Sequence, residues 1–147
     1  MELYFTARFE KFRDSLLSLK KINTIEWPEN EDIFGFIWCG VISKFCITFD
    51  LSYKLAKDIL VEYHGIINFA KGSPREILKE AYSADVINDE KWISMLKARN
   101  EIVHEYKDLD SVNEWCEKII KEYIPLFEEL LEYTKSIIDN QRRPNNL

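Results

Sequence analysis

The stretch from Arg99 to Tyr106 reads RNEIVHEY and brings together side chains suited to acid–base chemistry on a phosphate ester. A histidine whose pKa lies near neutrality, such as His104, can take a proton from a ribose 2′-hydroxyl or return one to the leaving oxygen. Arg99 is permanently cationic and can hold a phosphate through two parallel hydrogen bonds. Asn100 could orient the imidazole or bind the sugar. Chemistry of this kind requires no metal ion, and we expect neither a metal site nor a cofactor.

Helix geometry decides which of these side chains can act together, because each residue turns the helix by about 100°. Asn100 and His104 are four residues apart and share a face. Arg99 lies with Val103 and Tyr106 on the neighbouring stripe, about 140° away from His104. Arg99 and His104 therefore converge only if the helix end is distorted, or if two copies of the helix face each other across a symmetric dimer.

A purely structural reading of RNEIVHEY remains open beside the catalytic one. Basic groups near the C-terminal end of a helix interact favourably with the helix dipole, so such residues are common there. Taken alone, the spacing favours this structural reading. The other histidine, His64, stands before Gly65 at an expected helix end, where we predict a capping role.

Length and composition indicate one helical domain. The chain has 147 residues, enough for one core, and its four glycines and four prolines are too few for a turn-rich β-structure. The net charge of −6 argues against general nucleic-acid binding and leaves open a small local site or a basic partner. No run of 18 apolar residues occurs, so we expect no membrane span. The three cysteines suggest the packed, reduced thiols of a cytoplasmic protein.

Apolar periodicity predicts the helices that must position the motif. Phe5, Phe9, Phe12, Leu16 and Leu19 form one stripe of a first helix. A second helix is expected over about residues 33–63. Its first half is apolar nearly all round, so it is either central to the core or covered by a second subunit. Two glycines inside it, Gly35 and Gly40, suggest a close helix approach or a local bend. The aromatic side chains predicted to pack in the core are Trp38, Phe45, Phe49, Tyr53 and Trp92, the three at positions 45, 49 and 53 alternatively forming a dimer contact.

Three further helices are predicted from their capping residues. Ser73, Pro74 and Glu76 start the third, and Asn88 or Asp89 caps the fourth, whose inner stripe is expected to comprise Trp92, Leu96, Val103 and Tyr106.

The last helix is expected to start at the Ser111–Glu114 capping box, to end near Ile138, and to be kinked or divided at Pro125. The expected fold is therefore all-α, an antiparallel up-and-down bundle of four to five helices. We predict one domain over residues 1–140 and a frayed tail over 141–147.

Four stretches occurring in sequence order carry a family resemblance: FCITFDLSYKLAKDIL, SPREILKEAYSADVI, WISMLKARNEIVHEY and YIPLFEELLEYTK. Together they resemble the nucleotidyltransferase substrate-binding proteins, a branch of the HEPN superfamily related to the HepT toxins. The resemblance covers about residues 5–135. Its most specific parts are SPREILKEAY and the Arg-Asn-x-x-x-His element.

The resemblance implies a HEPN-like helical bundle that forms a homodimer and assembles with a minimal nucleotidyltransferase (MNT). Many HEPN proteins use an Arg-x(4–6)-His motif, paired across the dimer, as a metal-independent ribonuclease site, which Arg99 and His104 match, with Asn100 as the polar companion. HepT toxins extend the motif to Arg-x4-His-x-Tyr, and the partner transferase silences the toxin by adding AMP to the tyrosine, here Tyr106. The older family name implies an alternative, a non-catalytic subunit that presents substrate to the transferase. A bundle that serves only for dimerisation is a third reading.

Overall fold

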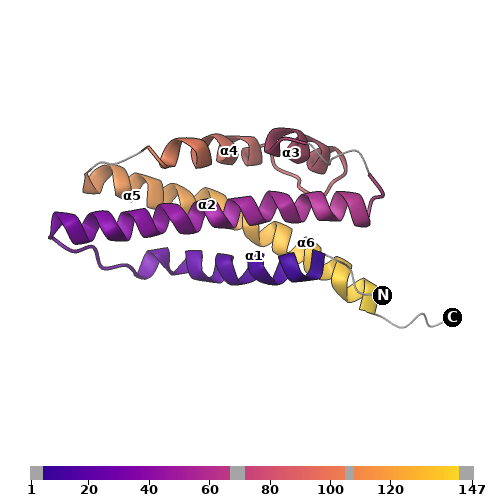
Figure 1. Ribbon diagram of the computed structural model, residues 1–147, viewed down its shortest axis with the longest axis horizontal. Coiled ribbons are helices and arrows are strands. Elements are labelled where there is room, and N and C mark those ends of the chain that lie inside the picture. The colour runs from indigo at the N-terminus through magenta and orange to yellow at the C-terminus, as the bar shows by residue number, and fades with distance from the viewer. Residues whose placement is uncertain (1–4, 67–71, 105–107, 143–147) are drawn as a thin grey trace.

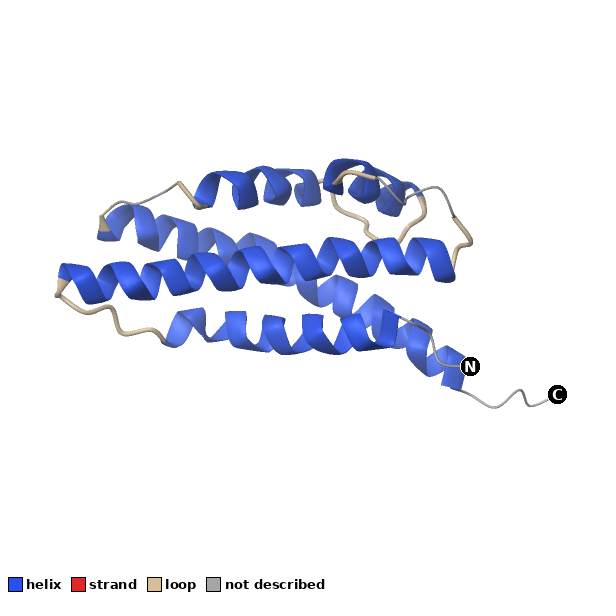
Figure 2. Ribbon diagram, viewed as in Figure 1, coloured by secondary structure: helices blue, strands red, loops and turns tan. Residues whose placement is uncertain are grey.

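The computed structural model describes residues 5–66, 72–104 and 108–142, which fold into packed helices with no strand among them (Figure 2). The predicted all-helical bundle is confirmed. The elements are α1 (Phe5–Leu19), a 3-10 segment (Lys20–Thr24), α2 (Glu31–Glu62), α3 (Pro74–Ser83), α4 (Lys91–Ile102), α5 (Leu109–Lys118), a π-helical segment (Ile119–Tyr123) and α6 (Ile124–Arg142). Because α5, the π-helical segment and α6 follow one another without a break, they form a single interrupted rod.

The 32-residue helix α2 runs the length of the bundle, and the other helices pack around it (Figure 1). Helix α1 lies antiparallel to α2 along one side of it. Helices α3 and α4 lie along the opposite side of α2, and the α5–α6 rod crosses behind α2. The first residue of α1 and the last residue of α6 lie at the same end of the bundle. The last residue of α4 and the first residue of α5 lie toward the other end.

Aromatic side chains join these helices in the core. The rings of Phe45 on α2 and Tyr123 of the π-helical segment stack with centroids 5.6 Å apart. The ring of Phe127 on α6 makes edge contacts with Phe12 on α1 at 5.9 Å and with Trp92 on α4 at 5.8 Å. Aromatic pairs of this geometry add to the free energy of burial, and here they fix α4 relative to α2. The predicted core positions Trp38, Phe45, Phe49 and Trp92 are all buried, and Tyr53 is partly buried.

Several predicted helix signals are confirmed. The five apolar residues predicted for the stripe of α1 are all buried. Helix α3 begins at Pro74, and the Ser73 hydroxyl accepts a hydrogen bond from the Glu76 N–H at 3.3 Å. Gly65 takes the left-handed backbone conformation, with φ of 70°, just beyond the end of α2. The neighbouring His64 donates its backbone N–H to the Ile59 carbonyl, so it belongs to the helix end as expected.

The predicted boundaries of the last two helices need correction. Helix α5 begins at Leu109, because Asp108 and not Ser111 is the cap: its carboxylate accepts from the Ser111 N–H at 3.0 Å. Helix α4 ends at Ile102, so its buried stripe differs from the predicted one and leaves Val103 46% exposed. The predicted cap of α4 at Asn88 or Asp89 also needs correction, because the N-cap is Glu90, which makes no side-chain capping hydrogen bond. Asp89, one residue earlier, accepts a hydrogen bond from the Lys91 N–H at 2.8 Å. The buried stripe of α4 comprises Trp92, Met95, Ala98 and Ile102.

The predicted interruption at Pro125 is confirmed. Proline lacks the N–H that would bond the carbonyl one turn earlier, and its ring clashes there, which disturbs the preceding turn. The disturbance takes the form of the π-helical segment Ile119–Tyr123. Helix α6 then continues to Arg142, beyond the expected end at Ile138. Residues 143–147 of the predicted tail lie outside the described residues.

Helix α2 is long enough and apolar enough to cross a membrane by length and composition alone. The core helix of a bundle passes the same test, and α2 buries side chains against α1, α3, α4 and α6. We therefore interpret its apolar composition as that of a core helix. The absence of 18 consecutive apolar residues agrees with this interpretation.

Candidate functional site

Arg99 is held by a carboxylate from another helix. Its Nε and Nη2 groups donate to the Oδ1 and Oδ2 atoms of Asp50 on α2, each at 3.1 Å. The two side chains are 28% and 35% exposed, so solvent reaches the pair. The hydrogen bond with Asp50 raises the pKa of Arg99, which keeps the guanidinium charged. The Nη1 group of the guanidinium takes no part in this pair.

A second contact fixes the backbone at the same place. The Cys46 thiol, one turn before Asp50, lies 3.9 Å from the Arg99 carbonyl and donates to it. Burial raises the pKa of Cys46, so the thiol keeps its proton. Burial, followed by the negative charge of Asp50, likewise raises the pKa of Tyr53. Asp50 and its neutral neighbours therefore form a fixed seat for Arg99.

The sequence analysis missed Asp50 as a site residue. The signal available was the acidic residue at position 50, since the other four acidic residues of α2 lie nearer its two ends. A carboxylate beside an apolar core favours a cationic partner. The partner stands 49 residues away along the chain. Nothing local in the sequence identifies which cation it is.

His104 and Asn100 lie apart from this ion pair, at the end of α4. Both side chains are exposed, and the His104 N–H donates to the Glu101 carbonyl at 3.0 Å. Over the described part of the chain, neither side chain makes a hydrogen bond or an ion pair. Within one copy Arg99 is thus directed to Asp50 and not to His104, while Tyr106 lies outside the described residues.

The end of α4 lies beside an uncovered stripe of α2. Helix α4 runs antiparallel to α2 (Figure 1), and the Arg99 carbonyl is level with Cys46. Five further residues, at about 1.5 Å each, place His104 about 7.5 Å nearer the start of α2. The exposed stripe of α2, with steps of four, three and four residues, consists of Phe36, Gly40, Ser43 and Ile47.

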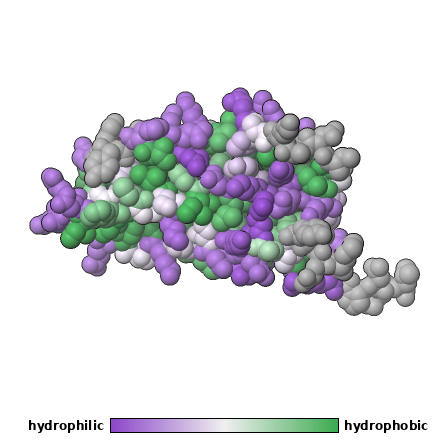
Figure 3. Space-filling model, viewed as in Figure 1, coloured by the Kyte–Doolittle hydropathy of each residue, from purple (hydrophilic) through white to green (hydrophobic). Residues whose placement is uncertain are grey.

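This α2 stripe is apolar and its side chains are open to solvent. Phe36 is 77% exposed and Ile47 48%, and the exposed Val103 adds to them from α4. Figure 3 shows hydrophobic side chains gathered over the first half of α2 and hydrophilic ones over much of its second half. A Cβ added to Gly40 would meet no atom of the structure within 4 Å. A glycine in a helix interior destabilises the helix by about 1 kcal/mol relative to alanine. No part of the described chain approaches position 40 closely enough to require a glycine there.

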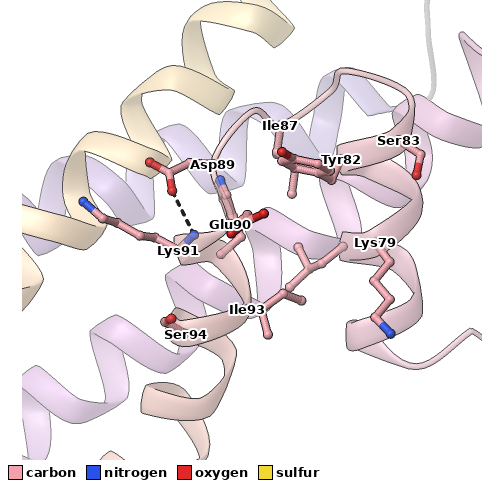
Figure 4. Close-up of a pocket in the computed structure, with 11 residues that line it drawn as sticks. Lys79, Tyr82, Ser83, Ile87, Asp89, Glu90, Lys91, Ile93 and Ser94 are labelled. Carbon is pink, nitrogen blue, oxygen red and sulfur yellow. Dashed lines mark hydrogen bonds between the residues drawn. The ribbon is translucent and has the colours of Figure 1, made fainter.

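A separate hollow of about 880 Å³ lies between α3 and α4 (Figure 4). Tyr82 and Ile93 face it, but the ammonium groups of Lys79 and Lys91 point away on opposite sides. Its polar groups do not converge on one point, which a binding site for a small molecule requires. Among the described residues no group of three or more histidine, cysteine or carboxylate side chains could hold a metal ion.

Comparison with known protein families matches residues 7–136 to the family described as nucleotidyltransferase substrate binding protein like. The matched segment includes Asp50, Arg99 and His104 and covers most of the chain. Among curated proteins, no sequence matches this chain.

We predict that Arg99 and Asp50 are energetically coupled. A double-mutant cycle with Arg99→Ala and Asp50→Ala, followed by urea unfolding, should give a coupling free energy of about 1 kcal/mol, because the pair is bidentate but partly screened by solvent. The coupling should weaken at high salt.

The exposed pair of Lys121 and Glu117 on neighbouring helical turns provides a matched control, for which the coupling should be smaller. A coupling for Arg99 and Asp50 no larger than that of this control would contradict a fixed seat for Arg99.

Proposed function

Because the chain belongs to the family of nucleotidyltransferase substrate binding proteins, we propose that it is the HepT-like HEPN subunit of a toxin–antitoxin pair with a minimal nucleotidyltransferase. In this proposal two copies form a metal-independent endoribonuclease with a composite site of Arg99, His104 and Asn100, and AMP transfer to Tyr106 silences it. The observation that supports a composite site is the separation of the two proposed catalytic side chains within one chain. Arg99 is hydrogen-bonded to Asp50, whereas His104 is exposed at the end of α4.

The two side chains suit complementary steps of RNA cleavage. The imidazole of His104 takes the proton of a ribose 2′-hydroxyl, whose oxygen then attacks the adjacent phosphorus. The bond from phosphorus to the 5′-oxygen breaks, and that oxygen receives a proton from the histidine imidazolium. The products are a 2′,3′-cyclic phosphate and a free 5′-hydroxyl group. Arg99 stabilises the charge that builds on the phosphate oxygens, and the bonds from Asp50 hold its guanidinium in one orientation.

A second copy is needed because one chain does not bring these groups together. The α2 stripe supports such a dimer, since it is apolar, exposed and includes a glycine where another helix can approach closely. The level of His104 along the first half of α2 supports this proposal, in which a chain that covers the stripe also contacts the exposed imidazole. An isologous contact across this stripe would place both copies of the motif around one groove.

One observation favours the alternative, a non-catalytic subunit that presents substrate to the transferase. Asp50 neutralises much of the charge of Arg99 and repels a phosphate that approaches the same guanidinium. Under this alternative the pair is structural, and the exposed end of α4 serves only as a binding surface.

We predict that His104→Ala lowers RNA cleavage by purified protein about 100-fold or more, because a general acid–base group contributes at least that factor. His64→Ala is the matched control, since these are the two histidines of the chain and His64 instead contacts the Tyr133 hydroxyl, at 3.2 Å. Cleavage should be followed on a labelled RNA at neutral pH. Equal activity of wild type and His104→Ala would remove His104 from the mechanism.

Phe36→Asp should convert the dimer to a monomer and abolish cleavage, because it places a charge at the most exposed apolar side chain of the α2 stripe. Its fold should persist, since Phe36 is 77% exposed. Tyr82→Asp, at an exposed aromatic residue on α3, is the control and should remain dimeric. Light scattering during size-exclusion chromatography gives the mass. A wild-type protein that is monomeric at all concentrations would refute the composite site.

Co-expression with an active minimal nucleotidyltransferase should attach AMP to Tyr106 and suppress cleavage. Mass spectrometry of the peptide containing Tyr106 detects the modification, and Tyr106→Phe should remain unmodified and active in the presence of the transferase. If Tyr106 stays bare in the wild-type protein, the silencing mechanism fails for this chain.

A further inference from the structure

An aromatic groove lies at the end of the bundle where α2 and α5 begin. Its volume is about 680 Å³. The rings of Trp27 and Phe34 pack against each other with centroids 4.9 Å apart, and Trp38 and Leu109 add apolar surface. Trp38 is buried, whereas Leu109 is 47% exposed. The groove therefore combines a fixed aromatic wall with an apolar edge open to solvent.

The charges around this groove have one sign. The acidic side chains that line it are Glu29, Glu31, Asp32 and Asp108, and no lysine or arginine lines it among the described residues. The sequence has the same bias, since residues 26–32 and 105–110 together contain seven acidic residues and one basic residue, Lys107. Some of these carboxylates also serve the helices, because Asp108 caps α5 and acidic residues in the first turn of α2 favour its dipole. Glu29 precedes the cap of α2 at Asn30 and has no such role.

The distribution of these charges excludes two kinds of ligand. A nucleic acid is repelled, because its phosphates carry the same sign as the groove. A metal ion needs several carboxylates at one point, and among the described residues no such group exists. Carboxylates spread around an aromatic wall suit several separate cationic side chains, which bind by charge pairing and by stacking on Trp27 or Phe34.

We infer that this groove docks a basic, lysine- and arginine-bearing segment of the nucleotidyltransferase, an inference that rests on the partnership in the proposed function. Charge complementarity of this kind steers association and fixes orientation. Asp108 follows Tyr106 by two residues, a span of at most about 7 Å of extended chain. A transferase seated on the groove is thereby held beside the tyrosine that it modifies.

The test measures binding of this chain to the purified minimal nucleotidyltransferase that the proposed function pairs with it. In the double variant Glu29→Lys and Glu31→Lys, the dissociation constant should rise about tenfold or more, and wild-type binding should weaken as salt is raised. The control carries the same change in net charge at exposed positions on α1 and α6, as Glu10→Lys with Glu129→Lys, and should bind within about twofold of wild type. Thermal unfolding of both variants establishes that they remain folded.

Each outcome decides the inference. Equal loss of binding in both double variants would reduce the effect to net charge and overturn a specific groove. Undiminished binding of the transferase by the groove variant would also overturn the inference. A groove variant that still binds the transferase but no longer self-associates would overturn it too, because the groove would then bind a second copy of this chain. RNA cleavage is a separate readout: a wild-type protein that binds the transferase through the groove but cleaves no RNA would remove the nuclease proposal and leave the docking site in place.

Discussion

The long apolar helix α2 is the constraint on which the rest of the structure depends. Its 32 residues are packed against α1, α3, α4 and α6, so it serves as the axis on which the other helices are placed. Four neighbours still do not cover it, because the stripe from Phe36 to Ile47 faces outward. The free energy available from covering that stripe grows with its apolar area. The monomer therefore retains a driving force for association on the very helix that supports Arg99.

The bond between Asp50 and Arg99 links this scaffold to the motif and limits what the motif can do. A carboxylate fixes the guanidinium in a defined plane and keeps it protonated, which prepares it to receive a phosphate. The same carboxylate competes with that phosphate for the cation. Asp50 thus fixes the orientation of the guanidinium and at the same time reduces its attraction for any other anion.

Local sequence patterns accounted for the elements better than for their contacts. The stripe of α1 and the Ser73 cap of α3 are encoded within a few residues, and both predictions were confirmed. The prediction for α5 was wrong because Asp108 and Ser111 are both good caps three residues apart, and only tertiary packing selects one. Val103 was assigned to a buried stripe that ends with the helix at Ile102.

The candidate site shows the same limit at longer range. The sequence shows the identities and spacing of Arg99, Asn100 and His104, and helix geometry shows that Arg99 and His104 point in different directions. The sequence does not predict the bond from Arg99 to Asp50. This bond joins residues 49 positions apart, and their pairing depends on how α4 lies against α2. Gly40 is similar: the sequence suggests a close helix approach, but in the fold no described atom lies within 4 Å of a Cβ added at this position.

The placement of the chain ends has a practical consequence. Helix α1 starts and α6 finishes at one end of the bundle, whereas the motif and the acidic groove lie toward the opposite end. A fluorescent protein, affinity tag or surface anchor fused at either terminus would project away from both. Immobilised or labelled forms can therefore leave the end that bears the motif and the groove exposed to solution, because the length of the bundle separates that end from the fusion.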